Sequence, residues 1–153
     1  MYKLLPALFF IFLLYGCSPS KSIQPIEEMT ERLLPENYSS FIFEEVPSDS
    51  DFFELEQRGE KIAIKGNNGV SMARGLNYFL RNYCHKSVSW CGNNMSGIPE
   101  VLPSLDQKVR VSASFPYRYY LNYCTYSYSM AYWDWARWEK EIDWMALQGI
   151  NMP

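Results

Sequence analysis

Three carboxylates stand close together near the end of the chain, at Glu139, Glu141 and Asp143. Carboxyl groups that are held near one another can act as a general acid and a general base. These three, however, lie within a segment of helical periodicity that follows a predicted strand. We therefore expect them to form a solvated helix face and not a catalytic pair.

Cysteine and histidine offer a second kind of chemistry. Cys84, His85 and Cys91 are three potential metal ligands within one short stretch. They lack the C-x-x-C spacing of zinc sites and the chain has a single histidine, so we predict no metal site. In an oxidising compartment, a disulfide between Cys84 and Cys91 is plausible; it would close a short loop and leave Cys124 unpaired.

The composition is that of a globular protein, with 48% hydrophobic and 20% charged residues among 153. This length fits one domain, or one small domain and part of another. The formal net charge is -3 and the Lys and Arg residues are scattered, so there is no basic surface for phosphates. We exclude nucleic acid as a partner.

Residues 1–17 have the pattern of a lipoprotein signal peptide. Lys3 provides a positive charge, and residues 4–14 form an apolar core shorter than the ~20 apolar residues that span a bilayer. Gly16 followed by Cys17 resembles a bacterial lipobox, in which the cysteine is lipidated. The alternative is an ordinary signal peptide with an incidental cysteine.

We therefore expect an exported bacterial lipoprotein whose membrane contact is a lipid anchor at Cys17, in the periplasm, at the outer membrane or at the cell surface. Ser18 stands where an acidic residue would favour retention, so the outer membrane or surface is favoured. Residues 18–31 are rich in Ser, Pro, Lys and Glu, and are expected to form a tether.

Residues 32–103 are predicted to form a small α+β domain, a sheet with one face covered by a helix. Residues 41–46, 52–56 and 61–65 have strand character, and the last two flank the hairpin signal Arg58-Gly59-Glu60. Asn68 is a suitable N-cap for the helix that follows. The apolar stripe of this helix recurs at three- and four-residue intervals and consists of Val70, Ala73, Leu76, Phe79, Leu80 and Tyr83.

Residues 109–153 are predicted to begin with strand structure. In residues 117–124 large side chains alternate between two faces, so this strand should be buried on both, as parallel strands covered by helices are. A helix follows, with an apolar stripe at Trp135, Trp138, Ile142 and Met145.

Arg137 and Glu141 stand one turn apart on the outer side of this helix and can pair. Gly149 is placed to end the helix in a left-handed conformation, and residues 150–152 begin a new apolar run. Strand, helix, glycine and second strand indicate a βαβ unit that is interrupted in its second strand. A buried strand needs ladder partners, so we expect the chain to carry only the start of a larger domain.

The stretch PYRYYLNYCTYSYSMAYWDWARWEKEIDWMALQGIN resembles the start of the catalytic barrel in the alpha-N-acetylglucosaminidases, a family of glycoside hydrolases. The resemblance lies in RYY-x-N-x-CT-x-SYS and in WDWARWE-x-EIDWMAL-x-GIN. The earlier stretch GNNGVSMARGLNYFLRNYC, with its preceding strands, is similar to the family's small N-terminal α/β domain. Together the two stretches cover roughly residues 32–153, and the resemblance implies that residues 109–153 are the first strand and helix of an incomplete TIM-type catalytic barrel.

This resemblance implies exo-acting release of terminal α-linked N-acetylglucosamine with retention of configuration, on a TIM-type (β/α) barrel without metal or cofactor. The chemistry needs two carboxyls about 5 Å apart, at the C-terminal ends of barrel strands. In the family both catalytic glutamates lie on later strands that this sequence lacks. We therefore nominate no catalytic residue.

The resemblance also implies that the end of the first barrel strand lines the sugar subsite, with Asn122, Cys124 and Tyr128. An Asn amide can bond two adjacent hydroxyls, a Tyr ring can stack on the sugar, and a thiol can form a small wall. The alternative is that Asn122 and Tyr128 satisfy buried backbone groups and Cys124 fills core. We expect Trp135 and Trp138 to pack between helix and barrel.

Two functions remain open. The leading hypothesis is the N-terminal part of an exported retaining exo-alpha-N-acetylglucosaminidase, acting on glycans with terminal alpha-N-acetylglucosamine and inactive by itself. The competing hypothesis is a complete small surface lipoprotein that binds glycans without catalysis, through its aromatic C-terminal segment. A β-hexosaminidase fits the first domain but not the Trp-rich segment.

Overall fold

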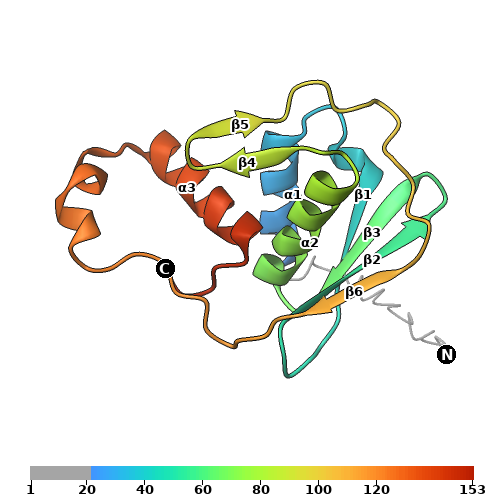
Figure 1. Ribbon diagram of the computed structural model, residues 1–153, viewed down its shortest axis with the longest axis horizontal. Helices are drawn as coiled ribbons and strands as arrows, with labels where there is room; N and C mark the ends of the chain where they lie inside the picture. Colours follow the sequence, from blue (N-terminus) through green and yellow to red (C-terminus); the bar gives the residue numbers. More distant parts are fainter. Residues whose placement is uncertain (1–21) are drawn as a thin grey trace, which may run out of the picture.

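The computed structural model describes residues 22–153 (Figure 1). The predicted signal peptide and the predicted lipidation at Cys17 lie outside this range. Within it, the fold is a mixed α+β unit with a small sheet and three α-helices, which confirms the predicted fold class. No helix among these residues is long and apolar enough to cross a membrane.

The first element corrects the sequence prediction. Helix α1 spans Ile23–Leu33, so most of the segment predicted as a tether, residues 18–31, is instead a helix of the folded domain. Ile26 and Met29 are buried on its inner side, and the Thr30 hydroxyl donates to the carbonyl of Ile26 at 2.6 Å. The apolar residues therefore recur at helical spacing even though Pro and Glu surround them.

The sheet has four strands in the order β1-β3-β2-β6. Strands β1 (Phe41–Glu45) and β3 (Lys61–Gly66) are parallel, and β2 (Phe52–Arg58) is antiparallel to β3. The predicted hairpin between β2 and β3 is confirmed, and Gly59 in its turn has a φ of 61°, which glycine adopts without strain.

Strand β6 (Val109–Ser112) lies at the other edge of the sheet, antiparallel to β2. The prediction that residues 109–153 belong together to the barrel is therefore wrong at its start, because β6 completes the sheet of the N-terminal domain. Its pairing satisfies backbone groups of β2 that would otherwise form a free edge. The domain extends past residue 103, to Ser112.

Helix α2 (Gly69–Asn82) covers one face of the sheet, as predicted (Figure 1). Asn68 is its N-cap, because its side-chain oxygen accepts the backbone N–H of Ser71 at 2.8 Å. Four residues of the predicted stripe are buried, namely Ala73, Leu76, Phe79 and Leu80. The helix approaches the sheet closely at Gly75, where a Cβ atom would lie 2.9 Å from Cγ2 of Ile64.

The remaining elements surround this core. Hairpin β4 (Ser87–Ser89) and β5 (Gly92–Asn94) follows α2, and helix α3 (Trp135–Gln148) packs beside α2 (Figure 1). Asn77, buried on α2, donates its amide to the carbonyl of Leu147 at 2.8 Å. Three short 3-10 helices complete the described structure, at Tyr38–Ser40 (η1), Thr125–Ser127 (η2) and Ser129–Tyr132 (η3).

Candidate functional site

The segment between β6 and α3 carries the predicted sugar-binding residues, and a parallel β-bridge holds its first part. Tyr119 pairs in parallel with Met152, which lies beyond α3. The N–H of Tyr120 donates to the carbonyl of Met152 at 3.1 Å, and the N–H of Asn151 donates to that of Arg118 at 3.3 Å. Extended segment, helix and parallel return are the parts of a βαβ unit, as the sequence predicted.

The predicted strand itself is much shorter than expected. Residues 117–124 form no strand beyond this bridge, and Tyr117, Tyr119 and Tyr123 are exposed. The prediction that both faces of this strand are buried is therefore wrong for the described structure. Met152 provides a ladder partner at a single position, which is too little to order a buried strand.

Asn122 lies where the chain leaves the bridge. The preceding residue, Leu121, has a φ of 75°, an uncommon backbone conformation for a branched side chain and a feature that clusters at functional sites. Oδ1 of Asn122 accepts the N–H groups of Cys124 and Thr125 at 3.0 and 3.2 Å, which fixes the side chain in a turn. Its Nδ2 has no protein partner within residues 22–153 and is free to donate to a ligand.

Cys124 and Tyr128 are placed differently from Asn122. Cys124 is a half-buried free thiol that precedes η2. Tyr128 follows η2 and is 71% exposed, so it does not satisfy a buried group. The three predicted residues therefore lie along one loop, and the described structure does not close them into a pocket.

Aromatic contacts hold this loop against α3. The ring of Tyr126 stacks on Trp138 at a centroid distance of 5.9 Å, and Trp133 meets Trp138 edge-on at 5.1 Å. The guanidinium of Arg137 lies 3.8 Å from the centre of the Trp133 ring. Trp138 thus packs between α3 and this loop, whereas Trp135 is 68% exposed and does not show the predicted packing between helix and barrel in the described structure.

Helix α3 has the predicted ends. Oδ1 of Asp134 caps its start by accepting the N–H of Arg137 at 2.9 Å, and Gly149 ends it in the left-handed conformation with φ 78°. The buried face is rotated from the predicted stripe, because Ile142 is exposed while Glu141 and Met145 are buried.

The carboxylate of Glu141 is buried, contrary to the sequence prediction of a solvated helix face. It pairs with Arg137 as predicted, at 2.8 Å, but Glu141 is 1% exposed and does not lie on a solvated face. Nε1 of Trp90 donates to both carboxylate oxygens at 2.8 Å, and the hydroxyl of Tyr120 donates to Oε1 at 2.9 Å. Trp90, Tyr120, Arg137 and Glu141 are called the Glu141 cluster below.

The sequence did contain a signal for this burial. Glu141 follows Trp138 by three positions and precedes Met145 by four, which is the spacing of one helix face.

Burial, together with the hydrogen bond to Glu141, raises the pKa of Tyr120 to about 12. Tyr120 therefore remains a donor throughout the neutral range.

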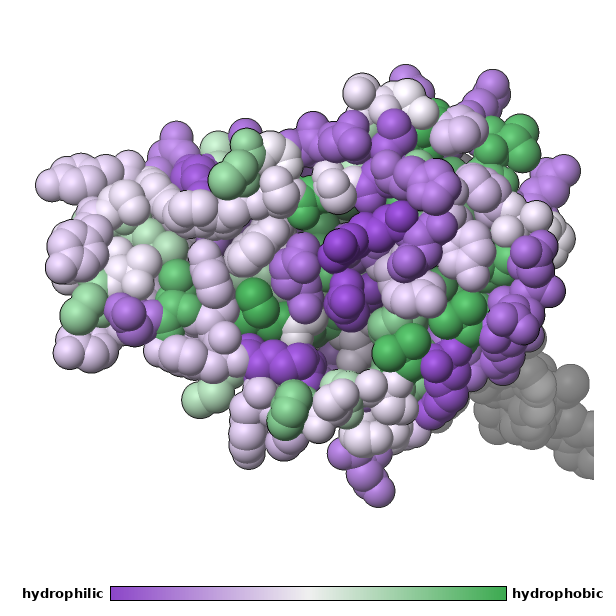
Figure 2. Space-filling view, viewed as in Figure 1, coloured by the Kyte–Doolittle hydropathy of each residue, from purple (hydrophilic) through white to green (hydrophobic). Residues whose placement is uncertain are grey.

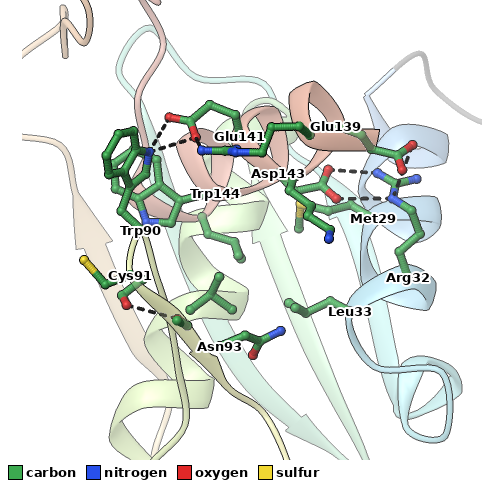
Figure 3. Close-up of a pocket in the computed structure, with 16 residues that line it drawn as sticks. Met29, Arg32, Leu33, Trp90, Cys91, Asn93, Glu139, Glu141, Asp143 and Trp144 are labelled. Atoms are coloured by element: carbon green, nitrogen blue, oxygen red, sulfur yellow. Dashed lines mark hydrogen bonds and ion pairs between the residues drawn. The ribbon is translucent and has the colours of Figure 1, made fainter. Parts of the chain in front are cut away.

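The other two carboxylates of α3 face helix α1. The guanidinium of Arg32 binds both oxygens of Asp143, at 2.8 and 3.2 Å, and lies 3.7 Å from Glu139. Figure 3 shows Asp143 pointing toward Arg32 and Glu141 pointing toward Trp90. A cavity of about 480 Å³ separates α1, the β4–β5 hairpin and α3, and these groups line it. All three carboxylates are engaged in structural contacts.

A second polar junction links the loop before β2 to the start of the barrel segment. Asp51 accepts the guanidinium of Arg118 and the amides of Asn67 and Asn68, the latter two at 3.0 and 2.8 Å. Arg118 also donates to the carbonyl of Gly149. Burial acts to raise the pKa of Asp51, but the hydrogen bonds from Arg118 and Asn67 outweigh it, so this pKa lies below its ordinary value.

The cysteines do not form the predicted disulfide. Cys84 is a buried free thiol at the end of α2, and Cys91 is an exposed free thiol in the turn of the β4–β5 hairpin. Cys84 belongs to the hydrophobic core, whereas Cys91 faces solvent. Across the described part of the chain, no group of three or more His, Cys, Asp or Glu residues is arranged to hold a metal ion.

On the face seen in Figure 2, the surface over the barrel segment differs from the surface over the centre of the molecule. Figure 2 shows strongly hydrophilic groups gathered over the centre, while the left side, over the loop between β6 and α3, is mostly pale. The segment between β6 and α3 exposes several aromatic side chains, namely Tyr117, Tyr119, Tyr123, Tyr128 and Tyr132, and Trp135 is exposed at the start of α3.

Comparisons with known proteins match both parts of this architecture. Residues 24–104 match the alpha-N-acetylglucosaminidase (NAGLU) N-terminal domain, and residues 118–153 match the alpha-N-acetylglucosaminidase (NAGLU) TIM-barrel domain. The human alpha-N-acetylglucosaminidase is 46% identical over 92 residues, which are 60% of this chain and 12% of the human protein.

Solved structures agree with this result. A family 89 glycoside hydrolase from Clostridium perfringens, in complex with 2-acetamido-1,2-dideoxynojirimycin, superimposes with a TM-score of 0.80 at 41% identity. A doubly substituted form of the Clostridium enzyme, in complex with its substrate GlcNAc-alpha-1,4-galactose, gives a TM-score of 0.79. Each match covers 84% of this chain and 15% of the Clostridium chain.

The chain therefore spans a small part of the length of the proteins that it matches. The N-terminal domain match alone includes more than half of its residues, and the barrel match begins at Arg118, next to the parallel bridge. On these grounds the chain belongs to the alpha-N-acetylglucosaminidase family, family 89 of the glycoside hydrolases.

Proposed function

We propose that residues 24–153 form the N-terminal domain and the first strand and helix of a longer exo-acting, retaining alpha-N-acetylglucosaminidase. The observation that carries this proposal is the parallel bridge between Tyr119 and Met152 on either side of α3. In (β/α) barrels the active site lies at the C-terminal ends of the strands. Asn122, whose Nδ2 has no protein partner within residues 22–153, follows the bridge at that end.

The substrate class follows from the relatives. The Clostridium enzyme is seen with GlcNAc-alpha-1,4-galactose, a glycan with a terminal α-linked N-acetylglucosamine. In this chain, Nδ2 of Asn122 would donate to an oxygen of that sugar and the ring of Tyr128 would offer an apolar face to its C–H surface. Cys124 would form a small wall beside them.

The catalytic acids come from elsewhere in the proposed enzyme. Retaining hydrolysis needs a nucleophile and an acid/base about 5 Å apart. The Glu141 carboxylate is hydrogen-bonded to Trp90, Tyr120 and Arg137. The Asp143 carboxylate is hydrogen-bonded to Arg32. We place both catalytic carboxyls on barrel strands of the longer protein, and expect the 153-residue chain alone to be inactive.

The test is to express the full-length protein that contains these residues and to assay 4-nitrophenyl α-N-acetylglucosaminide. We expect hydrolysis, with the α-anomer of N-acetylglucosamine as the first product seen by NMR. Asn122→Ala should raise KM about tenfold, the usual loss for one well-placed polar contact, whereas Asn94→Ala, on exposed β5, should not. A product that first forms as the β-anomer, or no hydrolysis, would refute the proposal.

Location is a separate part of the proposal. We infer that the protein is exported and anchored through a lipid on Cys17, on the basis of the apolar residues 4–14 and the Gly-Cys pair that follows. Cells fed radiolabelled palmitate should label the wild-type protein in the membrane fraction, and should not label Cys17→Ala. Equal labelling of both proteins would exclude lipidation at this cysteine.

The exposed aromatic side chains support a second candidate function, which is glycan binding without catalysis. Tyr123, Tyr132 and Trp135 are 86%, 89% and 68% exposed, and exposed rings can stack on sugars. A full-length protein that binds GlcNAc-alpha-1,4-galactose but never cleaves it would favour this candidate over the enzyme.

A further inference from the structure

The Glu141 cluster joins parts of the chain that are far apart in the sequence. Trp90 stands in the turn of the β4–β5 hairpin, Tyr120 in the bridged segment of the barrel start, and Glu141 on α3. The carboxylate is 1% exposed and accepts hydrogen bonds from both sides of this junction. Like Asp51, Glu141 is a point where the N-terminal domain and the barrel start meet on one side chain.

Charge explains why the junction forms here. A buried carboxylate is costly unless it is paired and hydrogen-bonded. Arg137 supplies the positive charge to Oε2 at 2.8 Å, and Trp90 donates to Oε2 as well as to Oε1. Trp90 and Tyr120 both donate to Oε1, at 2.8 and 2.9 Å, so moving either ring disturbs the acceptor that the other one uses.

Tyr120 connects the Glu141 cluster to the predicted sugar subsite. Its N–H is tied to the carbonyl of Met152 and its ring meets Trp144 edge-on at 5.1 Å. One residue, Leu121, separates it from Asn122, and Leu121 has the unusual φ of 75°. Glu141 holds the side chain of Tyr120, two residues before Asn122. The backbone direction at Asn122 is therefore set close to this contact.

We propose that Glu141 is a positioning residue for the sugar subsite: its carboxylate holds the Trp90 hairpin and Tyr120 together and so fixes the strand end that carries Asn122. This inference rests on the proposed function. It assigns to the β4–β5 hairpin of the N-terminal domain a role in substrate affinity, which the hairpin exerts through Glu141 and Tyr120.

The test uses the full-length protein and removes one partner at a time. Trp90→Phe deletes the indole donor, and because Trp90 is 54% exposed this change should leave the fold intact. Tyr120→Phe deletes the hydroxyl, and Glu141→Gln replaces the charged acceptor by an amide that presents a donor to Arg137 or Trp90. Glu139→Gln, two residues away and half-exposed beside Arg32, is the matched control.

Two quantities are measured for each variant: the Kd of 2-acetamido-1,2-dideoxynojirimycin, and kcat and KM for 4-nitrophenyl α-N-acetylglucosaminide. Asn122 would contact a part of the sugar that does not react, so its displacement removes binding from ground state and transition state alike. We expect KM and Kd to rise together, about tenfold in Glu141→Gln and severalfold in Trp90→Phe and Tyr120→Phe. The kcat of the folded fraction should stay within about threefold of wild type, and Glu139→Gln should match wild type.

The outcomes separate three cases. If Trp90→Phe and Tyr120→Phe keep wild-type KM and Kd, the positioning role is overturned, even where Glu141→Gln fails to fold. If the variants lose only thermal stability or the yield of folded protein, the cluster is structural and the inference is equally overturned. If the wild-type protein neither binds the inhibitor nor cleaves the substrate, the proposed function fails first, and the positioning role fails with it.

Discussion

Replacing Asp51 with Asn is expected to weaken the junction between the N-terminal domain and the barrel start. Asp51 lies before β2 and accepts hydrogen bonds from Arg118 on one oxygen and from Asn67 and Asn68 on the other. An Asn side chain at this position keeps the shape and one acceptor oxygen. It removes the negative charge, and its amide group would point a donor at the guanidinium.

The structure sets the size of the effect. A hydrogen bond to a charged group contributes about 1.5–3 kcal/mol. The side chains of Asp51 and Arg118 are 17% and 23% exposed, so solvent screens the pair only in part. We expect Asp51→Asn to lower the free energy of unfolding by about 2 kcal/mol. For a chain of this length that corresponds to a fall in Tm of roughly 4–8 °C.

The pH dependence gives a sharper test. The pKa of Asp51 is lowered in the folded protein, so its contribution is present above the ordinary value of 3.8 and is lost as pH falls through the folded pKa. The amide of the Asp51→Asn variant does not titrate. The difference in Tm between wild type and variant should therefore be constant from about pH 7 to about pH 5 and should shrink as the solution is acidified below 3.8.

The assay is thermal unfolding followed by circular dichroism across this pH range. Asp49→Asn is the control, because Asp49 is an exposed carboxylate in the same loop. Two results would refute the reasoning: equal Tm values of Asp51→Asn and wild type at neutral pH, or a Tm difference that grows in acid. Either result means that the bond to Arg118 contributes no net stability.

Three further predictions concern the packed domain. Leu76→Ala removes a side chain that is 0% exposed and should cost about 2–5 kcal/mol in urea unfolding; a loss below about 1 kcal/mol would contradict its place in the core. Asn77→Ala leaves the carbonyl of Leu147 without its buried donor and should lower the free energy of unfolding by about 1–3 kcal/mol. The control Asn82→Ala removes an exposed hydrogen bond to Tyr78 and should lower it by about 0.5 kcal/mol or less. Burial raises the pKa of the Cys84 thiol to about 11. Iodoacetamide at about pH 8 under reducing conditions should therefore modify exposed Cys91 well before Cys84. Equal modification rates, measured by mass spectrometry, would show that Cys84 is accessible.

Local signals predicted those parts of the fold that short stretches of chain decide. The hairpin of β2 and β3, the Asn68 cap, the α2 stripe and the Gly149 end of α3 are confirmed, because turn chemistry, capping and helical spacing act over a few residues. The tether prediction is wrong for helix α1, because the Ser, Pro and Glu residues of this segment obscure the helical spacing of Ile26 and Met29.

The candidate site could be predicted only in part. Asn122, Cys124 and Tyr128 follow from the family resemblance, and the structure places them along one loop without closing a pocket around them. The spacing of two within residues 117–124 predicted a buried strand, but burial depends on neighbouring strands, and Met152 provides a bridge at a single position.

The sequence by itself determined the periodic elements, the family resemblance and the residue types that can contact a sugar. Tertiary structure alone decided that β6 completes the N-terminal sheet, that Cys84 lies in the core while Cys91 is exposed, and that Glu141 is buried. The physical reason is common to all three. Each depends on distant partners in the sequence or on core packing, and helix or strand periodicity specifies which side of an element is apolar but not which other element will cover it.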